Sequence, residues 1–217
     1  MQKNLTEIVF ILDRSGSMGG LEDDTIGGYN SMLKKQQAME GEATITTVLF
    51  DDKYELLHDR INLKAVSPIT QKEYFVRGTT ALLDAIGRTI AKIDAALSHT
   101  AEEYRAEKVL FVITTDGMEN ASREFSYDRV RELVEKQKQK GWEFLFLGAN
   151  IDAVETAGKF GINADRAANF HADEQGLEKN FMGVNNAVSG LRTFNAVPAS
   201  WKEGIEKDYT GRKGKRD

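Results

Sequence analysis

Short runs of β-branched and other apolar residues alternate along this chain with longer segments in which apolar residues recur at helical spacing. This alternation is typical of β-α units arranged around a mostly parallel sheet. The apolar runs predict strands over residues 6–12, 43–50, 54–63, 108–114, 142–147 and 167–171, and the helical spacing predicts helices over 21–39, 81–97, 127–140, 153–160 and 176–193. The pattern therefore predicts an α/β fold, three-layered and doubly wound.

Two neighbouring extended runs break the β-α alternation. The runs Ala43–Phe50 and Tyr54–Leu63 are separated only by Asp51-Asp52-Lys53. Such a link is too short for a crossover helix, so these strands are predicted to form an antiparallel hairpin. The nearly continuous apolar run Lys108–Thr114 is expected at the sheet centre, buried on both faces. We therefore expect a mostly parallel central sheet with one antiparallel edge strand.

Gly27 and Gly28 lie inside a predicted helix, where each glycine costs ~1 kcal/mol relative to alanine. The pair predicts that this helix backbone lies close against the sheet. After Asn195 the periodicity fades, so residues 1–195 are expected to form a single domain. Residues 196–217 are expected to form a flexible basic tail. The basic residues near its end are Arg212, Lys213, Lys215 and Arg216.

Composition narrows the functional classes. The 217 residues are 41% hydrophobic and 29% charged, as in an ordinary soluble globule. The absence of cysteine excludes disulfides and thiolate metal sites and favours a reducing, cytoplasmic setting. The N-terminus has too short an apolar run for a signal peptide, and no window is long enough to span a bilayer, so no membrane partner is expected. The net charge of −5 argues against a nucleic-acid partner.

Polar, glycine-punctuated turns follow two of the predicted strands. The sequence D-R-S-G-S supplies Asp13, Ser15 and Ser17 after the first strand, and T-T-D-G supplies Asp116 after the central one. The segment R-G-T-T-A-L-L-D-A supplies Thr80 at a helix N-terminus on the same side of the sheet. Ligands of open parallel sheets bind beyond the carboxyl ends of the strands, where these residues would meet. Carboxylate and hydroxyl oxygens suit Mg²⁺, with Mn²⁺ or Ca²⁺ as alternatives.

Several of these polar residues can also be explained without a bound metal. The first-loop serines and aspartate, taken alone, are equally well explained as a helix N-cap. Asp84, after Thr80, is interpreted as a supporting or capping group. Asp51 and Asp52 are first of all turn residues, with a smaller chance of lying at the rim of the site. Glu119 and Asn120 either shape a partner-binding surface or lie in a solvated loop. The three histidines have no paired spacing, so no zinc site is predicted.

The motifs D-x-S-x-S, G-T-T-A-L-L-D-A and T-D-G, in this order, resemble the von Willebrand factor type A (vWA) domain and its metal-ion-dependent adhesion site (MIDAS). The resemblance covers about residues 5–193 and implies a Rossmann-like fold. It also implies that a divalent metal is bound by Asp13, Ser15, Ser17, Thr80 and Asp116. Thr79 stands where this family usually has a second glycine.

The resemblance also implies a function. In this family the metal completes its coordination with a Glu or Asp carboxylate of a partner protein, so we expect a protein-binding module and no enzyme. Stand-alone microbial members often serve ATPase-linked assemblies, stress or resistance systems, or surface attachment. An ATPase-linked assembly is therefore a candidate partner. The sequence leaves the oligomeric state open.

Two other functions are compatible with a metal at this position. A metal-dependent phosphotransferase or phosphatase of the haloacid-dehalogenase type also places an aspartate after its first strand. That chemistry needs a second aspartate two residues later as general acid, where this chain has Ser15. The other alternative is a scaffold in which the ion is purely structural.

Overall fold

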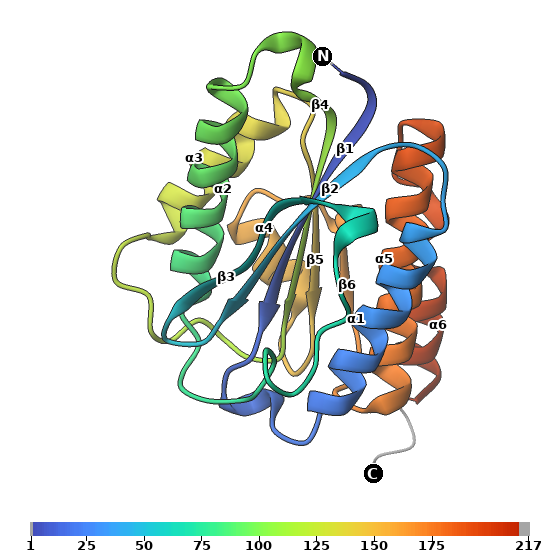
Figure 1. Cartoon of the computed structure of the whole chain (residues 1–217). Coiled ribbons are helices and arrows are strands. Elements are labelled where there is room, and N and C mark those ends of the chain that lie inside the picture. The colour runs from blue at the N-terminus through green and yellow to red at the C-terminus, as the bar shows by residue number, and fades with distance from the viewer. Residues whose placement is uncertain (1, 213–217) are drawn as a thin grey trace.

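The structure is a computed structural model that describes residues 2–212, with side chains described from Leu5 onward. Its strands are β1 (Gln2–Asp13), β2 (Ala43–Phe50), β3 (Tyr54–Asn62), β4 (Ala106–Thr115), β5 (Glu143–Gly148) and β6 (Ala167–Asn169). They form one sheet in the order β3-β2-β1-β4-β5-β6 (Figure 1). Only β3 runs antiparallel to its neighbour within this described sheet. The predicted mostly parallel sheet with one antiparallel edge strand is confirmed.

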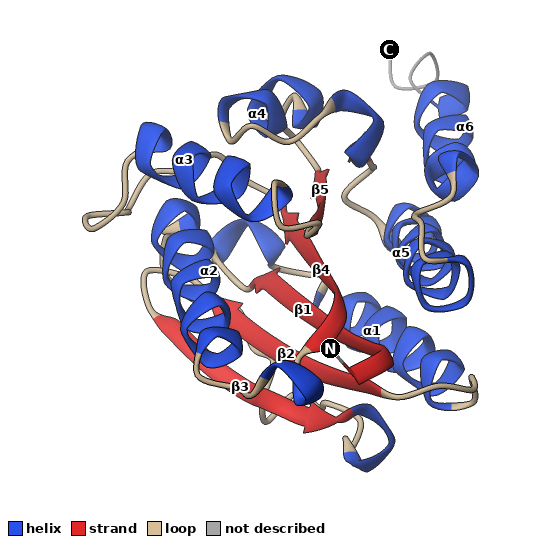
Figure 2. Cartoon of the chain, turned by 90° about the horizontal axis from the view of Figure 1, so that it is seen from above, coloured by secondary structure: helices blue, strands red, loops and turns tan. Residues whose placement is uncertain are grey.

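Helices cover both faces of this sheet (Figure 2). They are α1 (Glu22–Gln37), α2 (Leu82–Ser98), α3 (Tyr127–Lys138), α4 (Ala153–Lys159), α5 (Glu174–Phe194) and α6 (Glu203–Arg212). Helices α1, α5 and α6 lie on one side, and α2, α3 and α4 lie on the other. The three-layer α/β architecture is thus confirmed. None of the helices described is both long and apolar enough to cross a membrane.

The core consists of two apolar layers separated by the sheet. Along β1, Phe10 belongs to the layer under α1 and α5, whereas Ile11 belongs to the layer under α2, α3 and α4. Both side chains are fully buried. Because side chains alternate between the two faces of a strand, a strand covered on both sides is apolar over most of its length. This explains the apolar runs Ile8–Leu12 in β1 and Val109–Ile113 in β4. The buried Glu7 of β1 is an exception, and Arg60 pairs with it at 2.9 Å.

The glycines of α1 do allow a close contact of its backbone, as predicted, but the contact is with another helix, α5. A Cβ at Gly28 would lie 2.2 Å from Cδ2 of Phe181 in α5, whereas a Cβ at Gly27 would meet nothing within 4 Å. The prediction of contact with the sheet is therefore wrong. Gly28 lets α1 and α5 pack closely on the same face of the sheet, and Gly27 is exposed.

The C-terminal segment differs from the predicted flexible tail. Its described part, residues 196–212, contains a short helical turn, Ala199–Lys202, followed by α6, which packs on α5. Trp201 and Ile205 are each 1% exposed, and a Cβ at Gly183 of α5 would lie 2.6 Å from Cδ1 of Ile205. The segment packs closely because Gly183 leaves room on α5 for the Ile205 side chain and for the Trp201 backbone carbonyl. Lys213, Lys215 and Arg216 lie outside the described residues.

The register of the two central strands sets the position of the candidate site. Strands β1 and β4 are parallel neighbours, and Leu12 pairs with Thr114. Asp13 and Thr115, the last residues of these strands, therefore lie side by side at the carboxyl edge of the sheet. The loops that follow these strands begin from adjacent points, as the sequence pattern requires for a shared site.

Candidate metal centre

Asp13 is held at the junction of β1 and β4 by donors from both strands. One carboxylate oxygen accepts a 2.7 Å hydrogen bond from the Ser15 backbone N–H. The other accepts a 2.6 Å bond from the Thr115 hydroxyl and a 3.4 Å contact from the Asp116 backbone N–H. The side chain is 1% exposed. Asp13 is thus fixed by hydrogen bonds beside the loop that carries Asp116.

Three hydroxyl groups gather next to these carboxylates. The Ser15 and Ser17 Oγ atoms lie 3.2 Å apart, and the Thr80 hydroxyl donates a 3.0 Å bond to Ser15 Oγ. Gly117 lies over them, since a Cβ at this position would lie 3.2 Å from Ser17 Oγ and 3.5 Å from Thr80 Oγ1. The structure therefore brings together all five residues predicted for the site, from three separate loops.

Backbone contacts hold the three loops to one another. The first loop follows β1 and carries Ser15 and Ser17, the second precedes α2 and carries Thr80, and the third follows β4 and carries Asp116. The Gly16 N–H donates to the Gly78 carbonyl at 3.1 Å, which joins the first loop to the second. The Asn120 N–H donates to the Thr80 carbonyl at 3.0 Å, and the Thr80 N–H donates to the Asn120 side-chain oxygen at 2.9 Å. Gly78 has φ of +68°, and a Cβ there would lie 2.0 Å from Asp52 Oδ1, so only glycine fits. The loops form one preorganised unit.

Electrostatics at the site favour neutralisation of the carboxylates. Burial raises the pKa of Asp13, against hydrogen bonds from Ser15 and Thr115 that lower it. Burial and the nearby Asp13 charge raise the pKa of Asp116 to about 6, against a hydrogen bond from Asn150. Two buried carboxylates in such proximity repel one another unless a proton or a cation lies between them.

The donor set fits a hard divalent cation. Residues 2–212 contain no group of three or more His, Cys, Asp or Glu that could hold a metal. The site instead combines two carboxylates with three neutral hydroxyls. Oxygen donors of this kind suit Mg²⁺, Mn²⁺ or Ca²⁺ better than softer metals. The two negative charges would leave a divalent cation with little net charge, and the remaining coordination positions would need neutral or external ligands.

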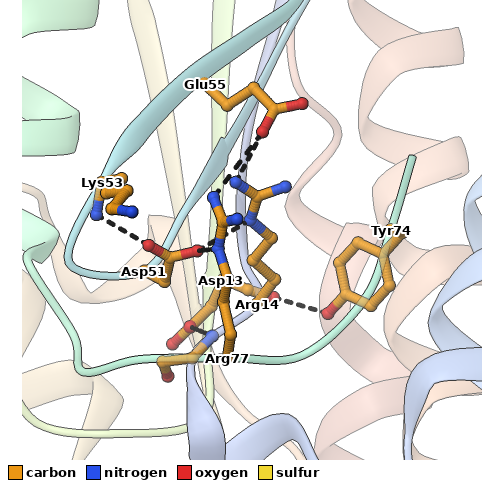
Figure 3. Close-up of polar contacts among 8 residues, drawn as sticks. Asp13, Arg14, Asp51, Lys53, Glu55, Tyr74 and Arg77 are labelled. Atoms are coloured by element: carbon orange, nitrogen blue, oxygen red, sulfur yellow. Dashed lines mark hydrogen bonds and ion pairs between the residues drawn. The ribbon is translucent and has the colours of Figure 1, made fainter. Parts of the chain in front are cut away.

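Arg14, which lies between two predicted ligands in the sequence, is buried in an ion-pair network (Figure 3). Its Nε lies 2.9 Å from Asp51 Oδ2, and neither side chain is exposed. Arg77 Nε lies 2.7 Å from the same oxygen, and Arg14 Nη2 lies 2.7 Å from Glu55 Oε2. Burial alone would raise the pKa of Asp51, but hydrogen bonds from Arg77, the Lys53 N–H and Arg14 hold it below its usual value.

The sequence did not indicate this network. An arginine in a glycine-rich loop and an aspartate in a hairpin turn are usually solvated, so neither position signalled burial. Asp51 is thus more than the turn residue that was predicted, because its carboxylate joins the hairpin to the loops of Arg14 and Arg77. The one available signal was the pairing of opposite charges at the ends of neighbouring strands β1 and β2.

Asn150 is a second residue that the sequence analysis missed. It adopts φ of +54°, in the left-handed region that asparagine tolerates better than most residues. Its side-chain amide donates a 2.5 Å bond to Asp116 Oδ1. A backbone in a sparsely populated conformation often accompanies a functional site. Here it places an amide donor against one of the two carboxylates.

The supporting residues near Thr80 behave largely as expected. Asp84 accepts 2.9 Å bonds from the backbone N–H groups of Arg123, Glu124 and Phe125 in the loop before α3, so of its two predicted roles, supporting or capping, it has the supporting one. Glu119 accepts from the backbone of Ala121 and Ser122 and from the Leu83 N–H, so it folds its own loop against α2. These contacts keep the second and third loops in place.

Comparison with known proteins places this geometry in a fold family. No protein-family model and no curated protein sequence matches the chain. The solved structures similar to it include a von Willebrand factor type A protein from Catenulispora acidiphila (TM-score 0.59, 15% identity, covering 85% of this chain and 42% of that one).

Two other similar structures are described as metal-bound. One is manganese-loaded TRAP from Plasmodium vivax (TM-score 0.58, 20% identity, covering 83% of this chain and 74% of that one). The other is proximal thread matrix protein 1 from the mussel byssus with a zinc-occupied MIDAS motif (TM-score 0.56, 14% identity, covering 83% and 44%). The chain spans less than half the length of the mussel and Catenulispora proteins. From its sheet order, its layers and these similarities, the chain has the von Willebrand factor type A fold.

Proposed function

We propose that this chain is a protein-binding module that holds a divalent ion, Mg²⁺ in the first instance, at Asp13, Ser15, Ser17, Thr80 and Asp116. The observation that carries the proposal is the convergence of two buried carboxylates and three hydroxyls from three interlocked loops. Such a centre supplies a Lewis-acidic position at the carboxyl edge of the sheet. The metal-bound proteins among the similar structures support the choice of a divalent ion.

The proposed ligand of this ion is a Glu or Asp side chain of a partner protein. Ser17 is exposed, whereas the other four residues are buried, so the ion would be reached from the side of Ser17. If one of the two aspartates binds the ion only through water, the ion keeps positive charge that an arriving carboxylate would offset. An ATPase-linked assembly in the cytoplasm stays a prediction for the partner, supported by the family resemblance and the absence of cysteine.

Binding fits these residues better than hydrolysis does. A phosphotransferase would need a proton donor two residues after Asp13. That position holds Ser15, whose hydroxyl is engaged by Ser17 and Thr80. We therefore propose that the chain is not an enzyme. Steady turnover of a phosphate ester that is lost in Asp13→Ala would contradict this part of the proposal.

The test uses Mn²⁺-loaded protein and acetate as a minimal carboxylate. Water-proton relaxation should be enhanced by bound Mn²⁺ and should fall when acetate displaces an inner water, while acetamide leaves it unchanged. Asp116→Ala should lose the enhancement. If acetate has no more effect than acetamide, the ion does not accept an external carboxylate. An ion that raises the melting temperature yet ignores acetate would indicate the purely structural alternative.

A further inference from the structure

A cavity of about 440 Å³ opens at the carboxyl ends of β5 and β6, beside the candidate metal centre. Asn150, the residue that donates to Asp116, forms part of its wall. The other residues that line it are Ile151, Asp152, Asn169, Phe170, His171, Ala172 and Tyr209. Its volume lies within the range of about 300–1,000 Å³ found for ligand pockets. The cavity and the metal centre thus share a wall.

The distance between the two sites suits a single ligand chain. Asp116 follows β4, and the cavity lies at the ends of the next two strands in the sheet. Neighbouring strands are about 4.8 Å apart, which places the cavity roughly 5–10 Å from the carboxylates. An extended peptide advances about 3.3 Å per residue. A side chain one to three residues from a metal-bound Glu or Asp would therefore reach the cavity.

The charge of the cavity is negative. Asp152 is its acidic residue, and no Lys or Arg is present among the described residues that line it. One Asp152 oxygen caps α4 by accepting from the Glu155 N–H at 2.9 Å. Lys159 is near this carboxylate but pairs with Glu155 at 2.8 Å, and Glu155, with a smaller contribution from Asp152, raises the pKa of Lys159. Asp173, at the same end of the molecule, differs in that Arg212 neutralises it at 2.7 Å.

The aromatic wall of the cavity is fixed by α6. The rings of His171 and Tyr209 lie 4.8 Å apart, and His171 Nε2 donates to the Tyr209 carbonyl at 3.1 Å. Arg212 pairs with Asp173 and with Asp208 and so holds α6 against the start of α5. An aromatic ring beside an acceptor carboxylate is a favourable environment for a guanidinium group, through cation–π contact and a charge-assisted hydrogen bond.

We propose that this cavity receives an arginine side chain of the partner protein, next to the carboxylate bound by the ion. This inference rests on the proposed function, because it takes the neighbouring site to be a metal centre that binds a carboxylate of the partner. Arginine fits better than lysine because its planar group carries several N–H donors, which can bond Asp152 and a second acceptor of the cavity wall together. The partner would therefore carry an acidic residue and an arginine a few positions apart.

The experiment uses blocked arginine, Nα-acetyl-arginine N-methylamide, and its neutral isostere, the corresponding citrulline compound. Each is titrated into ¹⁵N-labelled full-length protein with Mg²⁺. Arginine should shift the amide resonances of Asn150, Ile151 and Tyr209, and citrulline should bind about fivefold more weakly, as expected for the loss of one exposed charged contact. Equal binding of the two compounds, or no shift at these residues, would overturn the assignment.

Asp152→Asn is the matched variant, because asparagine caps a helix as well as aspartate does and the fold is retained. It should abolish the preference for arginine over citrulline. Glu174→Gln removes an equal charge from the exposed first turn of α5 and should keep the preference. An unchanged preference in Asp152→Asn would contradict the proposal.

A second part of the experiment distinguishes a failure of this proposal from a failure of the proposed function. With Mn²⁺ in place of Mg²⁺, the side-chain protons of bound arginine should broaden, because the cavity lies near the ion. Arginine-specific shifts without Mn²⁺ broadening would support the cavity and count against the metal centre. Mn²⁺ broadening of acetate without arginine shifts would support the metal centre and refute the cavity.

Discussion

The Arg14 guanidinium and the Asp51 carboxylate form an ion pair in which both side chains are fully buried, with Nε and Oδ2 separated by 2.9 Å. Arg14 lies between Asp13 and Ser15, and the Asp51 carbonyl accepts from the Ala81 N–H directly after Thr80. The pair therefore links the first loop of the site to the second through the hairpin turn. These two loops carry Ser15 and Thr80, whose hydroxyl groups are hydrogen-bonded to each other at 3.0 Å.

Asp51→Asn is expected to destabilise the protein strongly and to weaken metal binding. Breaking one partner of a buried ion pair costs about 3–5 kcal/mol, because the remaining charge is left uncompensated. Asparagine keeps one acceptor oxygen but removes the negative charge that Arg14 and Arg77 share, so the buried Arg14 would be left with the partly exposed Glu55. Urea unfolding and a Mn²⁺ titration measure the two effects. The control is Asp52→Asn in the same turn, which is exposed and should change stability by less than about 0.5 kcal/mol.

Stabilisation by Mg²⁺ is expected to depend on pH. The pKa of Asp116 is about 6, above its unfolded value, so without metal the folded state holds this proton more tightly and loses stability as pH rises from about 4 to 6. Mg²⁺ must displace the proton at low pH and meets no such competition above the folded pKa. The melting-temperature difference between Mg²⁺ and EDTA should therefore be small at about pH 5 and larger at about pH 7.5.

The pH experiment has a direct control. Asp116→Asn removes the titrating group and should show little Mg²⁺ effect at either pH. A difference between Mg²⁺ and EDTA that is the same at both pH values in the native protein would mean that Asp116 does not compete with protons for the ion.

The adjacent glycines of α1 are expected to respond in opposite directions. Gly27→Ala places a methyl group in open space and should stabilise the helix by about 0.5–1 kcal/mol. Gly28→Ala would place its Cβ 2.2 Å from the Phe181 ring and should destabilise the protein by about 1–3 kcal/mol through overpacking. Thermal unfolding of the two variants makes the comparison. Equal effects would contradict the packing of α1 on α5.

Trp201→Ala tests whether the C-terminal segment belongs to the folded unit. The indole is 1% exposed and its Nε1 donates to the Asp165 carbonyl at 2.9 Å, so the loss should be about 3–5 kcal/mol. Phe194→Ala provides the control, since that ring is 76% exposed and should contribute little. Denaturant unfolding that does not distinguish the two variants would show that the segment adds nothing to stability.

The layered fold and the grouping of the site residues were predictable because both depend on strong, repeated signals. Strands buried on two faces are apolar over most of their length, as in Ile8–Leu12 and Lys108–Thr114, and a short hairpin link admits one pairing. Parallel strands also have their carboxyl ends at one edge. The meeting of Asp13 with Thr80 and Asp116 follows from that topology, and their role as metal ligands stays a prediction.

The features that were not predicted depend on single residues whose surroundings come from distant parts of the chain. Helix α6 buries Ile205 through a surface that α5 provides, and its own sequence has almost no helical amphipathic pattern. Arg14 is buried because Asp51 and Glu55 reach it from the hairpin. Asn150 contacts Asp116 only because its backbone adopts a left-handed conformation. Apart from the opposite charges of Arg14 and Asp51 at the ends of neighbouring strands, local sequence patterns do not indicate such pairings.

The central claim is that one divalent ion is held by the cluster of Asp13, Asp116 and the three hydroxyls. Electron paramagnetic resonance of added Mn²⁺ tests it most directly, because free and bound Mn²⁺ give distinct signals. We predict one bound Mn²⁺ per chain, displaced by Mg²⁺, lost in Asp13→Ala and weakened in Thr80→Ala, with both variants still folded. Mn²⁺ that remains free in the native protein, or that binds equally well to Asp13→Ala, would contradict the claim.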